Sequence, residues 1–313
     1  MEAAAPPAPA AAHVGRRGKA PLTGRAREER RLGWMLCAPA VIAMVIVTGY
    51  PIIYAFILSL QRYDLRFPQD KEFVGLDNYK VVLQSSTWWS DVWNTVIITV
   101  ISVALELVLG MLIALVMHRA IFGRGPVRTA VLIPYGIITV VSAFAWRYAF
   151  DAGPGFVTHL FNLDPPPLTQ RGGSFLVIIL SEVWKTTPFM ALLLLAGLAL
   201  IPEELHRAAR VDGASAFQRF FRITLPLMKP AILVALLFRT LDAFRVFDSV
   251  FIMTRGANNT ESVSILGYNT LINRVNLGLG SAVSVLIFLC VILIAAVFVK
   301  LLGTGASPAG GRT

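Results

Sequence analysis

The chain has 313 residues, of which 56% are hydrophobic and only 15% are charged. This composition excludes an ordinary water-soluble domain and indicates that the chain folds in a lipid bilayer. The net charge of +10 does not indicate nucleic-acid binding, because the sequence lacks a basic stripe interleaved with aromatic residues.

The N-terminal residues 1–31 are rich in alanine and proline and then basic, which predicts a disordered cytoplasmic tail. Residues 32–305 contain six apolar stretches that are long enough for a membrane-spanning helix, which needs about 20 residues. These stretches cover residues 33–60, 93–117, 127–150, 174–200, 231–253 and 281–303. The first is too long for the apolar core of a cleaved signal peptide, so we interpret it as an anchor. We therefore predict an all-α integral membrane protein with one six-helix domain and a flexible C-terminal tail, 306–313.

The first outer loop, 61–92, contains the motif FVGLDNYK at Phe73–Lys80 and the pair Trp88 and Trp89. The two tryptophans precede the second predicted span, a position typical of an aromatic belt at the membrane surface. The two cysteines, Cys37 and Cys290, lie in predicted spans, so the sequence indicates neither a disulfide nor a metal framework.

Lysine and arginine residues are concentrated in the N-terminal tail, in the loop after the second predicted span, in residues 201–230 and at the C-terminus. The loops on the other side of the membrane hold fewer of them. By the positive-inside rule, we expect both termini and the 201–230 segment in the cytoplasm. The sequence thus predicts a multi-pass protein of the plasma membrane.

Several charged residues fall inside the predicted spans, where each costs about 2.5–3.5 kcal/mol to insert. Glu182 and Lys185 share one face of the fourth predicted span. In the fifth, four charges recur every three residues: Arg239, Asp242, Arg245 and Asp248. Successive side chains at this spacing are turned by about 60° around a helix, so the four cannot all line one cavity. These charges either serve a ligand or neutralise one another, Glu182 with Lys185 and Arg239 with Asp242. For Glu106, in the second span, we expect an ion pair with another helix rather than a site.

The segment between the fourth and fifth predicted spans includes ARVDGASAFQRFFRITLPLMKP, from Ala209 to Pro230. Residues 203–210 are acidic at their start and basic at their end, which favours a helix. Gly213 is expected to interrupt that helix, because glycine readily adopts a positive φ. A second helix is expected from Ala214, with Phe217, Phe220 and Phe221 on one face, until Pro226 ends it. Such an elbow would either transmit force from a soluble partner or lie passively on anionic lipid.

This elbow resembles the EAA loop of permeases in binding-protein-dependent ABC importers. The family pattern falls here on Arg207-Ala208-Ala209, Asp212-Gly213-Ala214 and Ile223-Thr224-Leu225-Pro226, with Arg207 where the family usually has glutamate. The motif at Phe73–Lys80 and the six spans are similar to the sugar-transporting branch of these permeases. Four further segments are similar to trehalose-importing members of that branch: Val127–Ile137, Glu182–Met190, Leu236–Asp248 and Ser262–Tyr268.

The resemblance implies a type I ABC importer permease fold and a subunit that moves a disaccharide, above all trehalose, by alternating access. Its implied partners are a second permease subunit, two copies of an ATPase subunit that binds ATP and Mg²⁺, an extracellular substrate-binding lipoprotein and membrane lipid. The sequence has no Gly-x-x-x-x-Gly-Lys-Ser/Thr loop, so we expect neither enzyme activity nor a bound cofactor in this chain itself. The alternative is an ion-coupled secondary carrier in which Glu106 or Asp242 relays protons.

The resemblance also assigns functional residues, since sugar contacts in the maltose-type permeases lie on the two spans that flank the loop. The contacts that it implies here are Glu182, Lys185, Thr186, Phe189, Arg239, Asp242, Ala243 and Val246, and we add Arg245 because of its charge. The residues that it implies for coupling to the ATPase are Arg207, Ala208, Ala209, Asp212, Gly213, Ala214, Phe217, Phe220, Leu225 and Pro226.

Overall fold

The computed structural model describes residues 24–119 and 124–305, and the chain divides into two compact units, Met1–Tyr54 and Ala55–Thr313. The first unit holds α1 (Gly24–Met44), the π-helical turn η1 (Val45–Gly49) and the start of α2 (Tyr50–Ser59). Residues Arg31–Ser59 are long and apolar enough to cross a membrane, which agrees with the first predicted span. The expectation of a disordered tail is wrong for residues 24–31, which are helical, and residues 1–23 and 306–313 lie outside the described part.

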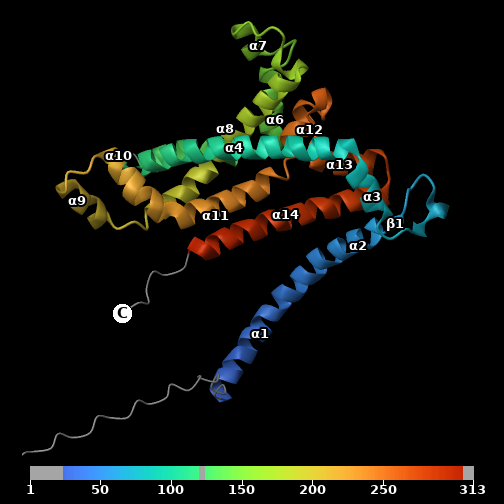
Figure 1. Cartoon of the computed structure of the whole chain (residues 1–313), viewed down its shortest axis with the longest axis horizontal. Coiled ribbons are helices and arrows are strands. Elements are labelled where there is room, and N and C mark those ends of the chain that lie inside the picture. Colours follow the sequence, from blue (N-terminus) through green and yellow to red (C-terminus); the bar gives the residue numbers. More distant parts are fainter. Residues whose placement is uncertain (1–23, 120–123, 306–313) are drawn as a thin grey trace, which may run out of the picture. The chain divides into compact units, whose positions relative to one another are not determined.

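Four long helices form the body of the second unit: α4 (Ser86–Arg119), α8 (Arg171–Leu198), α11 (Leu225–Ala243) and α14 (Leu277–Gly305). They run alongside one another in Figure 1, and α8 packs against both α4 and α11 through a shared apolar core. Gly110 of α4 permits this close approach, because a Cβ atom at that position would lie 2.8 Å from the side chain of Met190 in α8.

The third predicted span, 127–150, is not one helix. It consists of α5 (Arg124–Gly136) and α6 (Thr139–Ala149), which are bent by 90° at a break of two residues, Ile137 and Ile138. Pro134 and Gly136 precede the break, and both weaken a continuous helix at this point. Within the described residues, five long apolar helices and this bent pair together account for the six predicted spans.

The fifth predicted span, 231–253, has different limits from those expected. Helix α11 begins earlier, at Leu225, and ends at Ala243, and the separate α12 (Asp248–Met253) follows after a break. Pro226 lies in the first turn of α11, where proline is tolerated because the amide of that turn needs no partner in the helix. The prediction that Pro226 ends a helix is therefore wrong.

The outer end of the second unit is built from short elements. The strands β1 (Gln61–Arg62) and β2 (Glu72–Phe73) pair antiparallel, with Gln61 opposite Phe73, and α3 (Asp77–Gln84) follows. Asn78 of the FVGLDNYK motif donates to the carbonyl groups of Ser59 and Gln61, at 2.8 Å each, and so holds this hairpin to the end of α2. Trp88 is only 3% exposed within an apolar cluster, so the aromatic-belt prediction is wrong for it, whereas Trp89 is 57% exposed.

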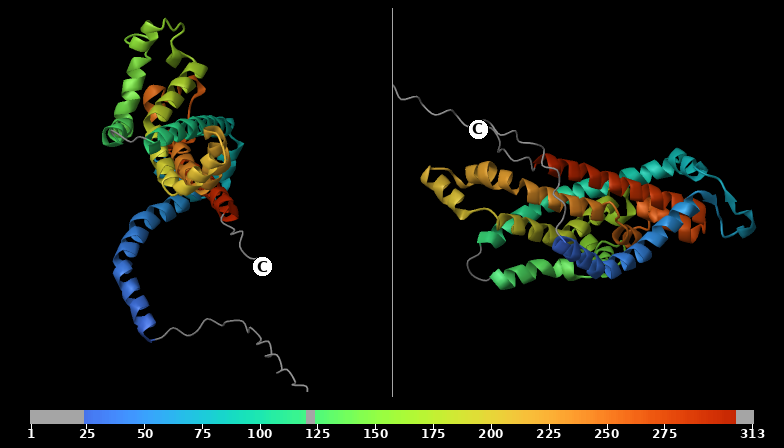
Figure 2. Two further views of the ribbon diagram at one scale, coloured as in Figure 1. Left: turned by 90° about the vertical axis from the view of Figure 1, so that its left-hand side faces the viewer. Right: turned by 90° about the horizontal axis from the view of Figure 1, so that it is seen from below.

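The remaining elements are short. The elbow formed by α9, α10 and η4 lies at one end of the long helices, α12 and α13 lie toward the opposite end, and α7 projects to one side (Figures 1 and 2). Their bounds are as follows: η2 (Pro68–Asp70), α7 (Phe156–Leu160), η3 (Pro167–Thr169), α9 (Glu203–Val211), α10 (Ala216–Arg219), η4 (Phe220–Thr224), η5 (Ala257–Asn259), α13 (Val263–Tyr268) and η6 (Asn269–Asn273).

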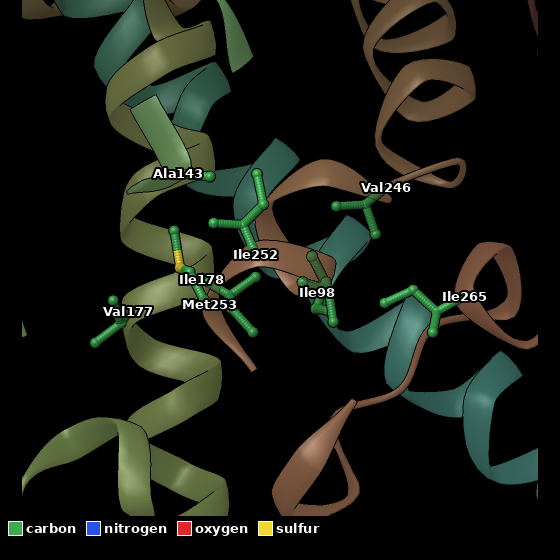
Figure 3. Packing of buried hydrophobic residues seen from close by; sticks show 9 residues of the cluster. Ile98, Ala143, Val177, Ile178, Val246, Ile252, Met253 and Ile265 are labelled. Atoms are coloured by element: carbon green, nitrogen blue, oxygen red, sulfur yellow. The ribbon is translucent and has the colours of Figure 1, made fainter. Parts of the chain in front are cut away.

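A buried apolar cluster fixes the position of α12 and of the chain that leads into it. Ile98 of α4, Ile178 of α8, Val246, Ile252 and Ile265 converge there, and Figure 3 shows these side chains packed between the ribbons. In a membrane, close packing of such side chains holds helices together through van der Waals contacts. The break between α11 and α12 is thus held rigidly, and polar side chains on its other face have a fixed position.

Candidate functional site

A cavity of about 530 Å³ lies where three elements meet. One wall is α8, the second is the junction of α11 and α12, and the third is the break between α5 and α6. The lining residues are Tyr135, Ile137, Ile138, Thr139, Glu182, Lys185, Thr186, Asp242, Arg245, Val246, Phe247, Asp248 and Ser249. We refer to this cavity as the polar pocket, because carboxylate, ammonium, guanidinium and hydroxyl groups all reach it.

The polar pocket contains most of the residues expected to contact a ligand: Glu182, Lys185, Thr186, Asp242, Arg245 and Val246. The other three do not line it. Ala243 is 2% exposed in the core between α4, α8 and α11, and Phe189 stacks on Tyr135 with ring centroids 5.4 Å apart. Arg239 is 1% exposed and lies behind the pocket wall.

Arg239 is the centre of a buried ion cluster. Its Nε and Nη2 atoms donate to the two carboxylate oxygens of Glu106 in α4, at 2.5 and 3.0 Å. Nη2 also donates to Glu182 Oε2 at 3.1 Å, and Nη1 donates to Asp242 Oδ2 at 2.6 Å. The rigid, planar guanidinium thus contacts three carboxylates from α4, α8 and α11. Glu106 is itself fully buried, and the hydroxyl of Thr186 donates to its Oε1 at 2.7 Å.

These contacts show which of the expected ion pairs form. The expected pair between Glu106 and another helix is confirmed, and so is the pair between Arg239 and Asp242. Glu182 is bonded to Arg239 and to Ser249, whose hydroxyl donates to Glu182 Oε1 at 2.6 Å, and not to Lys185. Asp242 remains 66% exposed although Arg239 holds one of its oxygens, so it presents a carboxylate to the cavity.

The two cations of the polar pocket are available to a ligand. Within the part of the chain that the structure describes, neither Lys185 nor Arg245 takes part in an ion pair. Lys185 Nζ lies over the ring of Tyr135, 5.6 Å from its centroid. The pocket therefore offers hydrogen-bond donors and acceptors beside an aromatic surface, an arrangement that suits an uncharged ligand rich in hydroxyl groups.

The elbow between α8 and α11 has the expected break at Gly213. Helix α9 ends in a Schellman motif, in which the Gly213 amide donates to Arg210 and the Ala214 amide donates to Ala209. Gly213 has a φ of +79°, which glycine adopts without strain. The second helix begins at Ala216 and not at Ala214, because Ser215 forms a capping box with Gln218 and a cap residue is not helical.

The elbow presents an exposed aromatic surface. Phe217 and Phe221 pack with centroids 4.5 Å apart, and Phe221 meets Phe220 edge to face at 5.0 Å, which agrees with their predicted common face. Phe217 nevertheless remains 73% exposed. Arg207 pairs with Glu203 on the same helix at 2.9 Å. The hydrogen bond from Arg207 lowers the pKa of Glu203.

Comparison with known proteins identifies the family. Residues 81–307 match the family described as binding-protein-dependent transport system inner membrane component. The chain belongs to this family. It is 57% identical over 288 residues to the trehalose transport system permease protein SugA of Mycobacterium tuberculosis H37Rv, a match that covers 92% of this chain and 94% of that protein. It is also 40% identical over 278 residues to the trehalose/maltose transport system permease protein MalF of Thermococcus litoralis, with 87% and 94% covered.

Solved structures support the fold of this permease. The structure of a bacterial ABC transporter involved in the import of the acidic polysaccharide alginate matches with a TM-score of 0.76. The match covers 90% of this chain and all of that one, at 22% sequence identity, so it bears on the fold alone. The predicted type I importer permease fold is confirmed, and the chain is a multi-pass component of the inner membrane and a transport permease rather than an enzyme.

The sequence did not reveal every residue of the permease's polar pocket. The residues of the α5–α6 break were not among the predicted ligand contacts, although Pro134 had indicated an opened backbone at this point and, with Gly136, flanks Tyr135. Ser249 had no signal, because a serine after an aspartate is common and only the fold brings it to Glu182.

A larger hollow of about 870 Å³ lies between α4 and η4–α11, but its lining is mostly aliphatic and aromatic and offers few polar groups to orient a ligand.

Proposed function

We propose that this permease imports a disaccharide, trehalose, through the polar pocket. The single observation that carries the proposal is the meeting of Glu182, Asp242, Lys185 and Arg245 in one cavity between the two helices that flank the elbow. The names of the relatives support the choice of sugar, since the two permeases named above transport trehalose or trehalose and maltose. An ion-coupled carrier is set aside, because the family depends on a binding protein.

The proposed complex contains a second permease subunit, two ATPase subunits and an extracellular substrate-binding lipoprotein. ATP and Mg²⁺ would be held by the ATPase subunits, because this chain has no phosphate-binding loop. The elbow would dock on the ATPase from the cytoplasmic side, through the residues of the EAA pattern and the exposed ring of Phe217. This orientation places both termini in the cytoplasm, in agreement with the distribution of lysine and arginine.

The continuity of the helices gives the proposed mechanism a physical basis. Helix α9 follows α8, which carries Glu182, and η4 passes directly into α11, which carries Asp242. The 18 residues from Leu225 to Asp242 span about 25 Å of helix, so a displacement at the elbow is transmitted to the pocket by a rigid element. Closure of the ATPase subunits on ATP would therefore move two pocket walls together and open the cavity alternately to the two sides of the membrane.

The test replaces one exposed carboxylate of the pocket. Asp242→Asn in the complete complex, reconstituted with the binding protein in liposomes, should reduce the trehalose imported per ATP hydrolysed by about tenfold, because a charge-assisted hydrogen bond to the sugar is lost. The matched control is Asp77→Asn. Like Asp242, Asp77 pairs with a cation three residues away, here Lys80, but it lies at the start of α3, outside the pocket. An unchanged ratio for Asp242→Asn would contradict the proposed pocket.

A further inference from the structure

Glu106 belongs to the second predicted span and does not line the polar pocket, yet it contacts the residue that organises it. The side chain is fully buried, and both of its oxygens are engaged. A buried carboxylate is costly in a membrane protein unless it is paired, and the pair with Arg239 meets that requirement. Pairing alone would need only one of the three carboxylates around Arg239, so the other two contacts require a different explanation.

The geometry of the guanidinium links Glu106 to the pocket. Two nitrogen atoms of Arg239 are bonded to Glu106, and this two-point contact fixes the plane of the guanidinium. The same group then directs Nη2 to Glu182 and Nη1 to Asp242, both of which line the pocket. Oδ2 of Asp242 is held by Arg239, and because its carboxylate is largely exposed, the remaining oxygen can face a ligand.

Loss of Glu106 would leave Arg239 bonded only to the two pocket carboxylates. Its guanidinium could then turn about its long side chain and draw Glu182 and Asp242 with it, because no contact from α4 would oppose the rotation. The hydroxyl of Thr186 would also lose its acceptor on Glu106 and keep only the carbonyl oxygen of Glu182, at 2.6 Å. Both consequences act on residues of the pocket wall, although the substituted residue lies behind that wall.

We propose that Glu106 is a positioning residue of the polar pocket. It holds Arg239 in one orientation, and Arg239 in turn orients Glu182 and Asp242 toward the sugar. The role rests on the proposed import of a disaccharide through this pocket. Glu106 thereby determines how much sugar is carried in each cycle of ATP hydrolysis, without contacting the sugar itself.

The test uses the complete complex in liposomes, with trehalose presented on the binding protein, and measures the trehalose imported per ATP hydrolysed. Glu106→Gln should lower this ratio about tenfold, which is typical when a residue that orients ligand-binding groups is lost. A second variant is the double substitution Glu106→Gln with Arg239→Gln, which removes the fully buried pair but also leaves Glu182 without its cation. It should show the same low ratio, because Glu182 and Asp242 still lack an oriented guanidinium.

A purely structural role makes a different prediction for Glu106→Gln. If Glu106 only stabilised the helices, this variant would lower the unfolding temperature of the complex and leave the ratio at the wild-type value, and the proposal would be overturned. The control is Arg62→Gln with Glu72→Gln, which removes an exposed pair of the same two residue types from the β1–β2 hairpin. Its ratio should equal that of the wild type.

A third variant covers the case in which the two glutamine variants do not assemble. Glu106→Asp keeps the charge but withdraws the carboxylate by one methylene group, so Arg239 must shift to follow it. We expect the ratio to fall about threefold, less than for Glu106→Gln because the ion pair persists; a wild-type ratio would refute the role of Glu106. If Asp242→Asn shows the wild-type ratio of trehalose imported per ATP hydrolysed while Glu106→Asp lowers this ratio, the polar pocket itself has been assigned wrongly.

Discussion

Two regions of this permease are rich in charge, and they use it differently. In the buried ion cluster, Arg239 is 1% exposed and its partners come from three helices that are far apart in the sequence. In the elbow, Arg207 and Glu203 are neighbours on one helix and both are well exposed. The same two residue types therefore form a long-range tie in one region and a local surface pair in the other.

The difference follows from the surroundings. Water competes for the charges of the elbow and salt screens them, so the pair there contributes little to stability and its residues remain free to meet a partner. Water is excluded from Arg239 and Glu106 at the centre of the ion cluster, so these two charges depend on their protein partners and their geometry is fixed. The pocket is accordingly rigid at its rear wall, whereas the elbow presents a surface whose details only a partner can define.

The largest effect is expected from Arg239→Met. This change keeps much of the side-chain length but leaves Glu106 buried without its cation, which costs about 3–5 kcal/mol when one member of a buried pair is removed. The purified complex should unfold at a clearly lower temperature and be recovered in lower yield. Arg62→Met, which breaks an exposed pair, serves as the control and should have no such effect. Equal unfolding temperatures for the two variants would show that the ion cluster is not a stabilising tie.

A smaller effect on stability, but a clear one on transport, is expected at Gly213. No atom lies within 4 Å of a Cβ atom built there, so a substitution meets only the backbone strain of a positive φ, about 1–2 kcal/mol for an ordinary residue. Gly213→Val should abolish trehalose uptake while the chain still reaches the membrane. Gly213→Asn, which tolerates this conformation better, should retain part of the activity. Equal activity of the two variants would show that the conformation of this turn does not matter for coupling.

The smallest effect is expected from Arg207→Gln in the elbow. Arg207 lowers the pKa of Glu203, so the pair stabilises the folded chain at neutral pH and this contribution is lost as the pH falls through the lowered pKa. Because both side chains are exposed, the unfolding temperature of the variant should differ only marginally from the wild type at neutral pH and not at all in acid. Thermal unfolding of the purified complex at the two pH values measures this, and a large difference would mean that the pair is buried in the complex.

The sequence predicted some parts of the permease better than others, and the reason is physical. The spans were found because about 20 apolar residues in a row have few structures other than a transmembrane helix. Their interruptions were harder to place. Proline marked the break near Ile137, but the break between α11 and α12 has no proline or glycine within residues 244–247 and depends on the packing of Val246 and Ile252 against α4 and α8.

The polar pocket shows the same division. Glu182, Lys185 and Asp242 stood out because a charge inside an apolar span requires a reason, and the family resemblance assigned them to the ligand. The same resemblance assigned Arg239 to the ligand, although it lies behind the wall, because spacing along one helix does not reveal what a neighbouring helix contributes. Ser249 and the lining residues of the α5–α6 break were not predicted as contacts, since their proximity to Glu182 exists only after the helices pack.

The sequence by itself determined that this chain spans a membrane, which loops carry the basic residues, and where glycine must turn the elbow. Each of these is decided by local composition and by the backbone preferences of single residues. Only the tertiary structure decided which carboxylate Arg239 binds, which charges remain open to a ligand and where the fifth span breaks. Those outcomes depend on contacts between α4, α8 and α11, and side-chain spacing within one helix carries no information about them.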